Sequence, residues 1–182
     1  MNWDFLVIVA EYCDFPTLIA LRSTCSLFRK RVQIKSITGK LRWKLNDKNL
    51  LLFPHFTILN AADNSEITDA SVGLLTQLIT LEASSNPKIT DASVGLLTQL
   101  TTLDARWNES ITDASVAKLT QLTTLEASGN LKISDASVGL LVQLTALDAS
   151  GNYSITDASV AKLTQLTTLD ARWNESITDA SV

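Results

Sequence analysis

Apolar and polar residues alternate in short stretches that recur along the chain. Between residues 124 and 128, Leu125 and Ala127 alternate with Thr124, Glu126 and Ser128. This alternation is typical of a β-strand with one buried face, because successive side chains of a strand point to opposite sides. We therefore predict that Leu125 and Ala127 point into a core. The three polar residues are predicted to face solvent.

A second pattern, Ile-Thr/Ser-Asp-Ala-Ser-Val, follows each predicted strand and returns every 22 residues. It begins at Ile67, Ile89, Ile111, Ile133, Ile155 and Ile177. The Asp of the pattern, for example Asp135, is predicted to cap a short helical turn. A strand and a helical turn that repeat with a period in the twenties are typical of leucine-rich repeats. The predicted fold class is therefore α/β, a leucine-rich-repeat solenoid with a parallel β-sheet on its concave face and short helical turns on its convex face.

The repeat frame extends upstream in a weaker form. Ile34 and Ile37 still fit it, although Arg42 stands where later repeats have Asn. We predict a small helical module at residues 1–33 and leucine-rich repeats at residues 34–182. The repeats comprise six full units of 22 residues and a partial seventh that begins at Leu166.

Two columns of polar residues are predicted to be structural. An Asn ends each strand, where its amide can bond to backbone groups of the turn. One Asp per repeat, with no second ligand beside it, is a poor site for a hard cation. We expect no metal and no cofactor. The Asn column is Asn64, Asn86, Asn108, Asn130, Asn152 and Asn174, and the Asp column is Asp69, Asp91, Asp113, Asp135, Asp157 and Asp179.

Charge divides the chain into two parts. Residues 1–48 carry nine basic and four acidic residues, a net charge of +5, whereas residues 49–182 carry six basic and fifteen acidic residues, a net charge of −9. Acidic repeats argue against nucleic acid as a partner, because phosphate binding needs basic surface. The apolar run 5–10 is too short to span a membrane, and no basic residue precedes it. We expect an intracellular protein, cytoplasmic or nuclear, with Cys13 and Cys25 as small buried residues.

The N-terminal module carries apolar residues at helical spacing. They are Leu18, Leu21, Cys25, Phe28 and Val32, separated by three or four positions. The stretch Tyr-Cys-Asp-Phe-Pro-Thr-Leu-Ile-Ala-Leu-Arg-Ser-Thr-Cys-Ser-Leu-Phe-Arg-Lys-Arg-Val at residues 12–32 resembles an F-box, with Tyr12, Asp14 and Arg29 also at matching positions. The chain departs from that family at Met1-Asn2, which replaces Leu-Pro, and at Phe28, which replaces Trp.

The resemblance implies that the module docks onto a Skp1-type adaptor of a cullin ubiquitin ligase, while the repeats recruit a protein target. The residues implied in adaptor binding are Leu6, Val9, Pro16, Leu18, Leu21, Cys25 and Phe28. An alternative is a binding scaffold whose N-terminal helices only cap the solenoid. The 22-residue repeat is similar to the internalin type, so a bacterial surface adhesin is a further alternative, although the chain lacks a signal-peptide pattern.

The predicted concave face offers two candidate features for target binding. A column of carboxylates about 5 Å apart repels by roughly 1 kcal/mol per neighbouring pair in water, which a basic partner would relieve. Alternatively, the column was copied with the repeat and only keeps the surface soluble. Two Arg-Trp pairs also interrupt positions that are Ser-Ser or Ser-Gly elsewhere, and both residue types are common binding hot spots. The candidate target-binding residues are Glu82, Asp104, Glu126, Asp148 and Asp170 of the column, with Arg106, Trp107, Arg172 and Trp173 of the pairs.

The chain contains a long internal duplication and a single histidine. Residues 100–116 and 166–182 are identical, so recent duplication alone would place Arg and Trp at both sites. Catalysis has little support, because the only histidine, His55, lies in an early turn with no nucleophile patterned near it. We expect a protein-binding chain that is not an enzyme.

Overall fold

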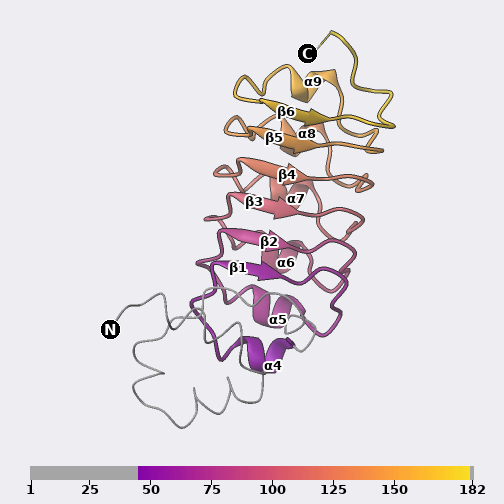
Figure 1. The fold of residues 1–182 in the computed structure, drawn as a ribbon. Helices are drawn as coiled ribbons and strands as arrows, with labels where there is room; N and C mark the ends of the chain where they lie inside the picture. Colours follow the sequence, from indigo (N-terminus) through magenta and orange to yellow (C-terminus); the bar gives the residue numbers. More distant parts are fainter. Residues whose placement is uncertain (1–44, 181–182) are drawn as a thin grey trace.

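The computed structural model describes residues 45–180, which form a solenoid with a six-stranded parallel sheet (Figure 1). Consecutive strands are neighbours, and each residue pairs with the residue 22 positions later, as Leu103 does with Leu125. This register confirms the predicted repeat length. The strands are β1 (Ile58–Asn60), β2 (Thr80–Glu82), β3 (Thr102–Asp104), β4 (Thr124–Glu126), β5 (Ala146–Asp148) and β6 (Thr168–Asp170).

One short helix per repeat lies on the side of the solenoid opposite the strands (Figure 1). The helices are α4 (Asp47–Leu50), α5 (Asp69–Val72), α6 (Asp91–Val94), α7 (Asp113–Val116), α8 (Asp135–Val138) and α9 (Asp157–Val160). Each helix is a single turn of four residues, and in α5 to α9 the last two of them, Ser and Val, are buried. The predicted arrangement of sheet and helical turns is confirmed.

The helix caps differ from the prediction by one residue. Thr90 has an extended backbone, and its hydroxyl accepts the N–H of Ala92 at 3.1 Å, so Thr90 is the N-cap of α6. The prediction that the Asp caps the helix is therefore wrong. Asp91 is the first helical residue, and its carboxylate accepts the N–H and the hydroxyl of Thr112 in the next repeat, at 2.8 and 2.6 Å. The Asp column thus links neighbouring repeats.

The core is a continuous stack of aliphatic side chains. Leu125 of β4 and Ala127 just after it are fully buried, as the alternation predicts, and so are Ile133, Val138 and Leu141 further along the same repeat. Each fully buried Leu, Ile or Val side chain contributes about 1.5–3 kcal/mol to stability. The corresponding positions of the neighbouring repeats are buried in the same way.

The Asn column is structural, as predicted. Asn130 is fully buried, and its Nδ2 donates to the carbonyls of Ala105, Asn108 and Ile111 in the preceding repeat, at 3.2, 2.7 and 3.1 Å. Its Oδ1 accepts the N–H of Lys132 at 3.0 Å. One amide therefore satisfies several backbone groups where the chain turns inside the protein.

Several predictions fall outside the described residues. They concern the helical module at residues 1–33, its boundary with the repeats, Cys13, Cys25 and the seven adaptor-binding residues. Within residues 45–180, no helix is long and apolar enough to cross a membrane. The same part of the chain contains no group of three or more His, Cys, Asp or Glu side chains suited to a metal ion. His55 is exposed and lies in a turn, as expected.

Candidate protein-binding surface

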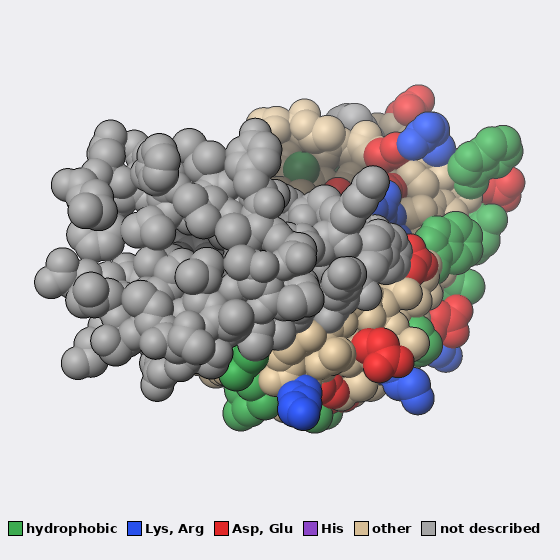
Figure 2. Space-filling model, turned by 60° about the horizontal axis from the view of Figure 1, so that its bottom comes forward, with side chains coloured by type: hydrophobic (Ala, Val, Ile, Leu, Met, Phe, Trp, Pro, Cys, Tyr) green, Lys and Arg blue, Asp and Glu red, His purple; other side chains and the backbone are tan. Residues whose placement is uncertain are grey.

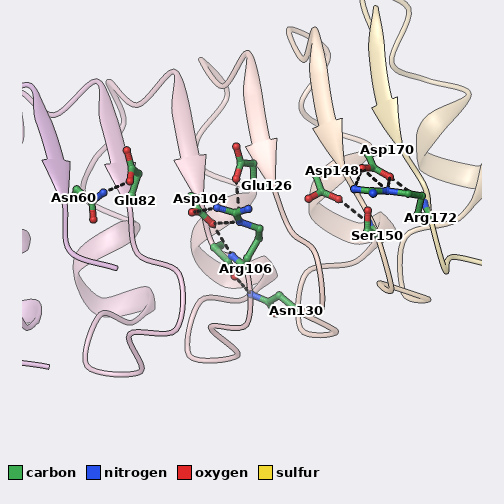
Figure 3. A network of polar contacts seen from close by, with 11 residues as sticks. Asn60, Glu82, Asp104, Arg106, Glu126, Asn130, Asp148, Ser150, Asp170 and Arg172 are labelled. Carbon is green, nitrogen blue, oxygen red and sulfur yellow. Dashed lines mark hydrogen bonds and ion pairs between the residues drawn. The ribbon is translucent and has the colours of Figure 1, made fainter. Parts of the chain in front are cut away.

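The last residue of every strand projects a polar side chain from the sheet, so these side chains form a row across the repeats (Figure 3). The in-register pairing places them side by side, because each strand end lies next to the corresponding strand end of the following repeat. The row consists of Asn60, Glu82, Asp104, Glu126, Asp148 and Asp170. The structure therefore brings the five predicted carboxylates together.

Arg106 lies within the row and pairs with two of its carboxylates. Its Nε and Nη2 donate to the two carboxylate oxygens of Asp104 at 3.0 and 2.8 Å, and its Nε also lies 3.0 Å from Oε2 of Glu126. The Asp104 side chain is only 7% exposed, so its charge faces Arg106 rather than solvent. The hydrogen bond with Asp104 raises the pKa of Arg106 against the opposite effect of burial.

The same pairing recurs three repeats later in a more open setting. Nη2 of Arg172 lies 2.6 Å from Oδ2 of Asp170, and the two side chains are 77% and 32% exposed. The side-chain and backbone hydrogen bonds from Arg172 lower the pKa of Asp170. The identical sequences therefore form the same local bond, but only the earlier Asp is buried.

Negative charges remain close together around Glu126 even though Arg106 pairs with it. Burial raises its pKa, Arg106 opposes that effect, and the negative charges of Asp104 and Asp148 add to it. Among the described residues, neither Glu82 nor Asp148 makes an ion pair. Glu82 accepts a hydrogen bond from the Asn60 amide, and Asp148 accepts the N–H of Ser150 at 2.9 Å.

Trp107 and Trp173 lie just after the row and are 68% and 83% exposed. Both adopt positive φ angles, +56° and +60°, as do the residues at the same place in the other described repeats, which are Asp63, Ser85, Gly129 and Gly151. This left-handed backbone was not predicted from the sequence, although Gly at two positions of the column is a signal for it.

Two further exposed side chains belong to the same edge and were not predicted as site residues. Leu131 and Tyr153 each follow the buried Asn of their repeat and are 43% and 54% exposed. A single exposed Leu or Tyr in a sequence carries little information. Only the stacking of the repeats shows that these two are neighbours.

Comparison with known proteins identifies the fold. No protein-family model matches the chain, and no curated protein matches it. Among solved structures, internalin F from Listeria monocytogenes is 28% identical with a TM-score of 0.56, covering 75% of this chain and 47% of that one. Internalin C2 from the same organism is 22% identical with a TM-score of 0.53, covering 82% and 71%. The chain has the leucine-rich-repeat fold.

Yeast Rad7, crystallised in complex with Elc1, is also similar in fold. Its TM-score is 0.61 at 18% identity, covering 78% of this chain and 43% of Rad7. The chain spans less than half the length of Rad7 and of internalin F. Leucine-rich-repeat solenoids present an extended concave surface for binding, which is where the carboxylate row lies.

Proposed function

We propose that this chain recruits a protein target to a ubiquitin ligase, with the leucine-rich repeats holding the target and the N-terminal module binding a Skp1-type adaptor. The observation that carries the target-binding half is the strand-end row with its two neighbouring exposed Trp residues. Exposed Trp and Arg beside a rigid sheet have the composition of a binding hot spot.

The rigidity of the repeats supports this role. Neighbouring repeats are joined through the Asn and the helical Asp. From Thr101 onward they are also joined through a Thr ladder, in which the Thr123 hydroxyl donates to the Thr101 carbonyl at 3.1 Å. A surface that is already ordered loses little conformational entropy when a partner binds. The scaffold therefore presents its side chains at fixed separations.

The adaptor-binding half rests on the F-box resemblance of residues 12–32. Yeast Rad7, which shares the fold, was crystallised in complex with a second protein, and this agrees with a repeat chain that works in an assembly. A second candidate is a plain binding scaffold. The similarity to internalin F supports this candidate. In it, the N-terminal helices would only cap the solenoid.

The test is to titrate the purified full chain against a Skp1-type adaptor. We expect micromolar or tighter binding that a Leu21→Ala, Phe28→Ala double variant loses, because both side chains belong to the proposed adaptor contact. A Leu96→Ala variant is the matched control, since Leu96 is 57% exposed and follows helix α6 of the repeats, outside residues 12–32. Circular dichroism should show the repeats folded in all three proteins.

Absence of binding by the folded wild-type chain would overturn the ligase proposal and favour the scaffold. Binding that both variants retain would show that the interface lies elsewhere. In that case residues 12–32 would have lost their proposed role.

A further inference from the structure

An exposed apolar strip runs along the edge of the solenoid where the strands end. It consists of Trp107, Leu131, Tyr153 and Trp173, one from each of four consecutive repeats, and we call it the turn-edge strip. Figure 2 shows hydrophobic side chains along the edge on the right of the view, with acidic side chains among them. The strip lies immediately beyond the carboxylate row, because Trp107 and Trp173 follow β3 and β6 by three residues.

Folding does not account for the two Trp residues. A side chain other than Gly in the left-handed region costs about 1–2 kcal/mol, and the large exposed fractions show that neither ring is part of the core. Ser85 and Gly151 occupy the same backbone position without such a ring. Strained, exposed residues of this kind cluster at binding sites.

The negative charge around the strip favours a partner with basic side chains. Exposed Glu109 and Glu175 follow the two Trp-Asn pairs, and residues 45–180 carry sixteen acidic against seven basic residues, a net charge of −9. Arg106 and Arg172 are already bound to Asp104 and Asp170, and exposed Lys132 follows Leu131 in the middle of the strip. A Trp face beside carboxylates favours Lys or Arg side chains through cation–π and ionic attraction.

The distance between the two Trp residues indicates how a partner would bind. Trp107 and Trp173 are three repeats apart, which corresponds to about 14 Å at the usual distance between neighbouring strands. Four residues of an extended chain span nearly the same length, about 13–14 Å. Two side chains four positions apart in an extended segment can therefore reach both Trp residues, with the residues between them over Leu131 and Tyr153.

We propose that the turn-edge strip binds an extended segment of another protein that carries two basic side chains four residues apart. This inference rests on the proposed function of the repeats as a protein-binding surface, and it names the chemistry of the target. The segment runs across the strands, along the axis of the solenoid. Its basic side chains lie against Trp107 with Glu109 and against Trp173 with Glu175.

The test uses two fluorescein-labelled nonapeptides of identical composition, titrated into the full chain by fluorescence anisotropy. The first carries Arg at its third and seventh positions with Ser and Val elsewhere, and the second carries Arg at its fourth and fifth positions. We expect the first peptide to bind about tenfold tighter, because only its spacing places one Arg at each Trp. Equal affinity for the two peptides, or binding of neither, would overturn the inference.

Protein variants then locate the binding. Trp107→Gly and Trp173→Gly install the residue that the chain itself uses at Gly129 and Gly151, so these variants fold without the left-handed strain. Each should weaken binding of the first peptide about tenfold and abolish the preference for its spacing. Leu96→Ala, on the far side of the repeats, should leave the affinity unchanged. Retained affinity in both Trp variants would contradict the proposal.

The adaptor titration separates this inference from the proposed function. If the chain binds the Skp1-type adaptor but neither peptide, only the inference about the turn-edge strip is contradicted. If it binds the first peptide but no adaptor, the inference about the strip stands and the ligase role is contradicted.

Discussion

Trp107 lies directly over Gly129 of the following repeat. A Cβ placed on Gly129 would lie 2.5 Å from Cε3 and Cζ3 of the Trp107 ring, too close for a non-bonded contact. Gly151, at the same position one repeat later, would meet no atom within 4 Å. The two glycines have φ angles of +66° and +62°, so they share a backbone requirement and differ only in the ring above.

This pair predicts different costs for the same substitution. Gly151→Ala should lower the free energy of unfolding by about 1–2 kcal/mol, because Ala tolerates the left-handed region poorly. Gly129→Ala should cost roughly 1–3 kcal/mol more, since the new methyl group must displace the Trp107 ring. Urea denaturation followed by circular dichroism measures both values.

A Trp107→Gly background provides the control. Without the ring, Gly129→Ala and Gly151→Ala should destabilise the protein equally. A persistent difference in that background would mean that the ring is not the cause.

The Asn column predicts a large loss of stability when an uncharged residue is replaced. Asn130→Ala would remove the side-chain donor from the carbonyls of Ala105, Asn108 and Ile111. The first two keep a backbone N–H donor, whereas the buried Ile111 carbonyl would lose its described donor. An unsatisfied buried polar group costs about 1–3 kcal/mol, so we expect a loss of roughly 2–3 kcal/mol in urea denaturation. Ser128→Ala, a half-buried position two residues earlier, should change stability by less than about 1 kcal/mol. Similar losses for the two variants would refute the role assigned to the amide.

The links between repeats predict a loss of stability in acid. Burial raises the pKa of Asp91, but hydrogen bonds from Ser115 and Thr112 outweigh it, and the net pKa lies below the ordinary value of 3.8. A carboxyl with a lowered folded-state pKa stabilises the protein above its unfolded-state pKa, and this contribution is lost as the pH falls through the folded-state value. Stability should therefore fall below about pH 4.

Two variants test whether Asp91 contributes to that fall. Asp91→Asn should be less stable than wild type at pH 7 and show a shallower decline in acid, because its side chain cannot titrate. Glu66→Gln, which changes an exposed carboxylate, should keep the wild-type slope. Urea denaturation between pH 3 and pH 7 provides the comparison, and equal slopes for wild type and Asp91→Asn would contradict the assignment.

Much of the fold could be predicted from the sequence because the repeat makes its pattern redundant. Buried Leu125 and Ala127, the parallel register and the Asn column each follow from alternation and a fixed period. The helix cap was misplaced because Thr and Asp are both good capping residues, and only the structure shows that the Asp carboxylate reaches the next repeat. A pattern within one repeat does not reveal bonds made between repeats.

The candidate surface was predictable only in part, for a similar reason. The carboxylate column follows from the period. The bond from Arg106 to Asp104 depends on the turn that contains the left-handed residue Trp107, and a hydrophobic pattern does not predict that turn. The neighbours Leu131 and Tyr153 carry no sequence signal of their own. They form a strip with Trp107 only because stacking brings successive turns together.

The two Arg–Asp pairs provide a matched comparison within one chain, because their sequences are identical and their exposure differs. Asp104 is nearly buried, so Arg106→Ala would leave its carboxylate without a counterion and should destabilise the protein by roughly 1–3 kcal/mol. Arg172→Ala should cost clearly less, because the Asp170 side chain is 32% exposed and water can replace the lost partner. Asp104→Asn combined with Arg106→Ala should recover part of the loss, since no buried charge remains. Urea denaturation of the four proteins, including wild type, tests the argument, and equal losses at Arg106 and Arg172 would show that burial of Asp104 does not determine the strength of the pair.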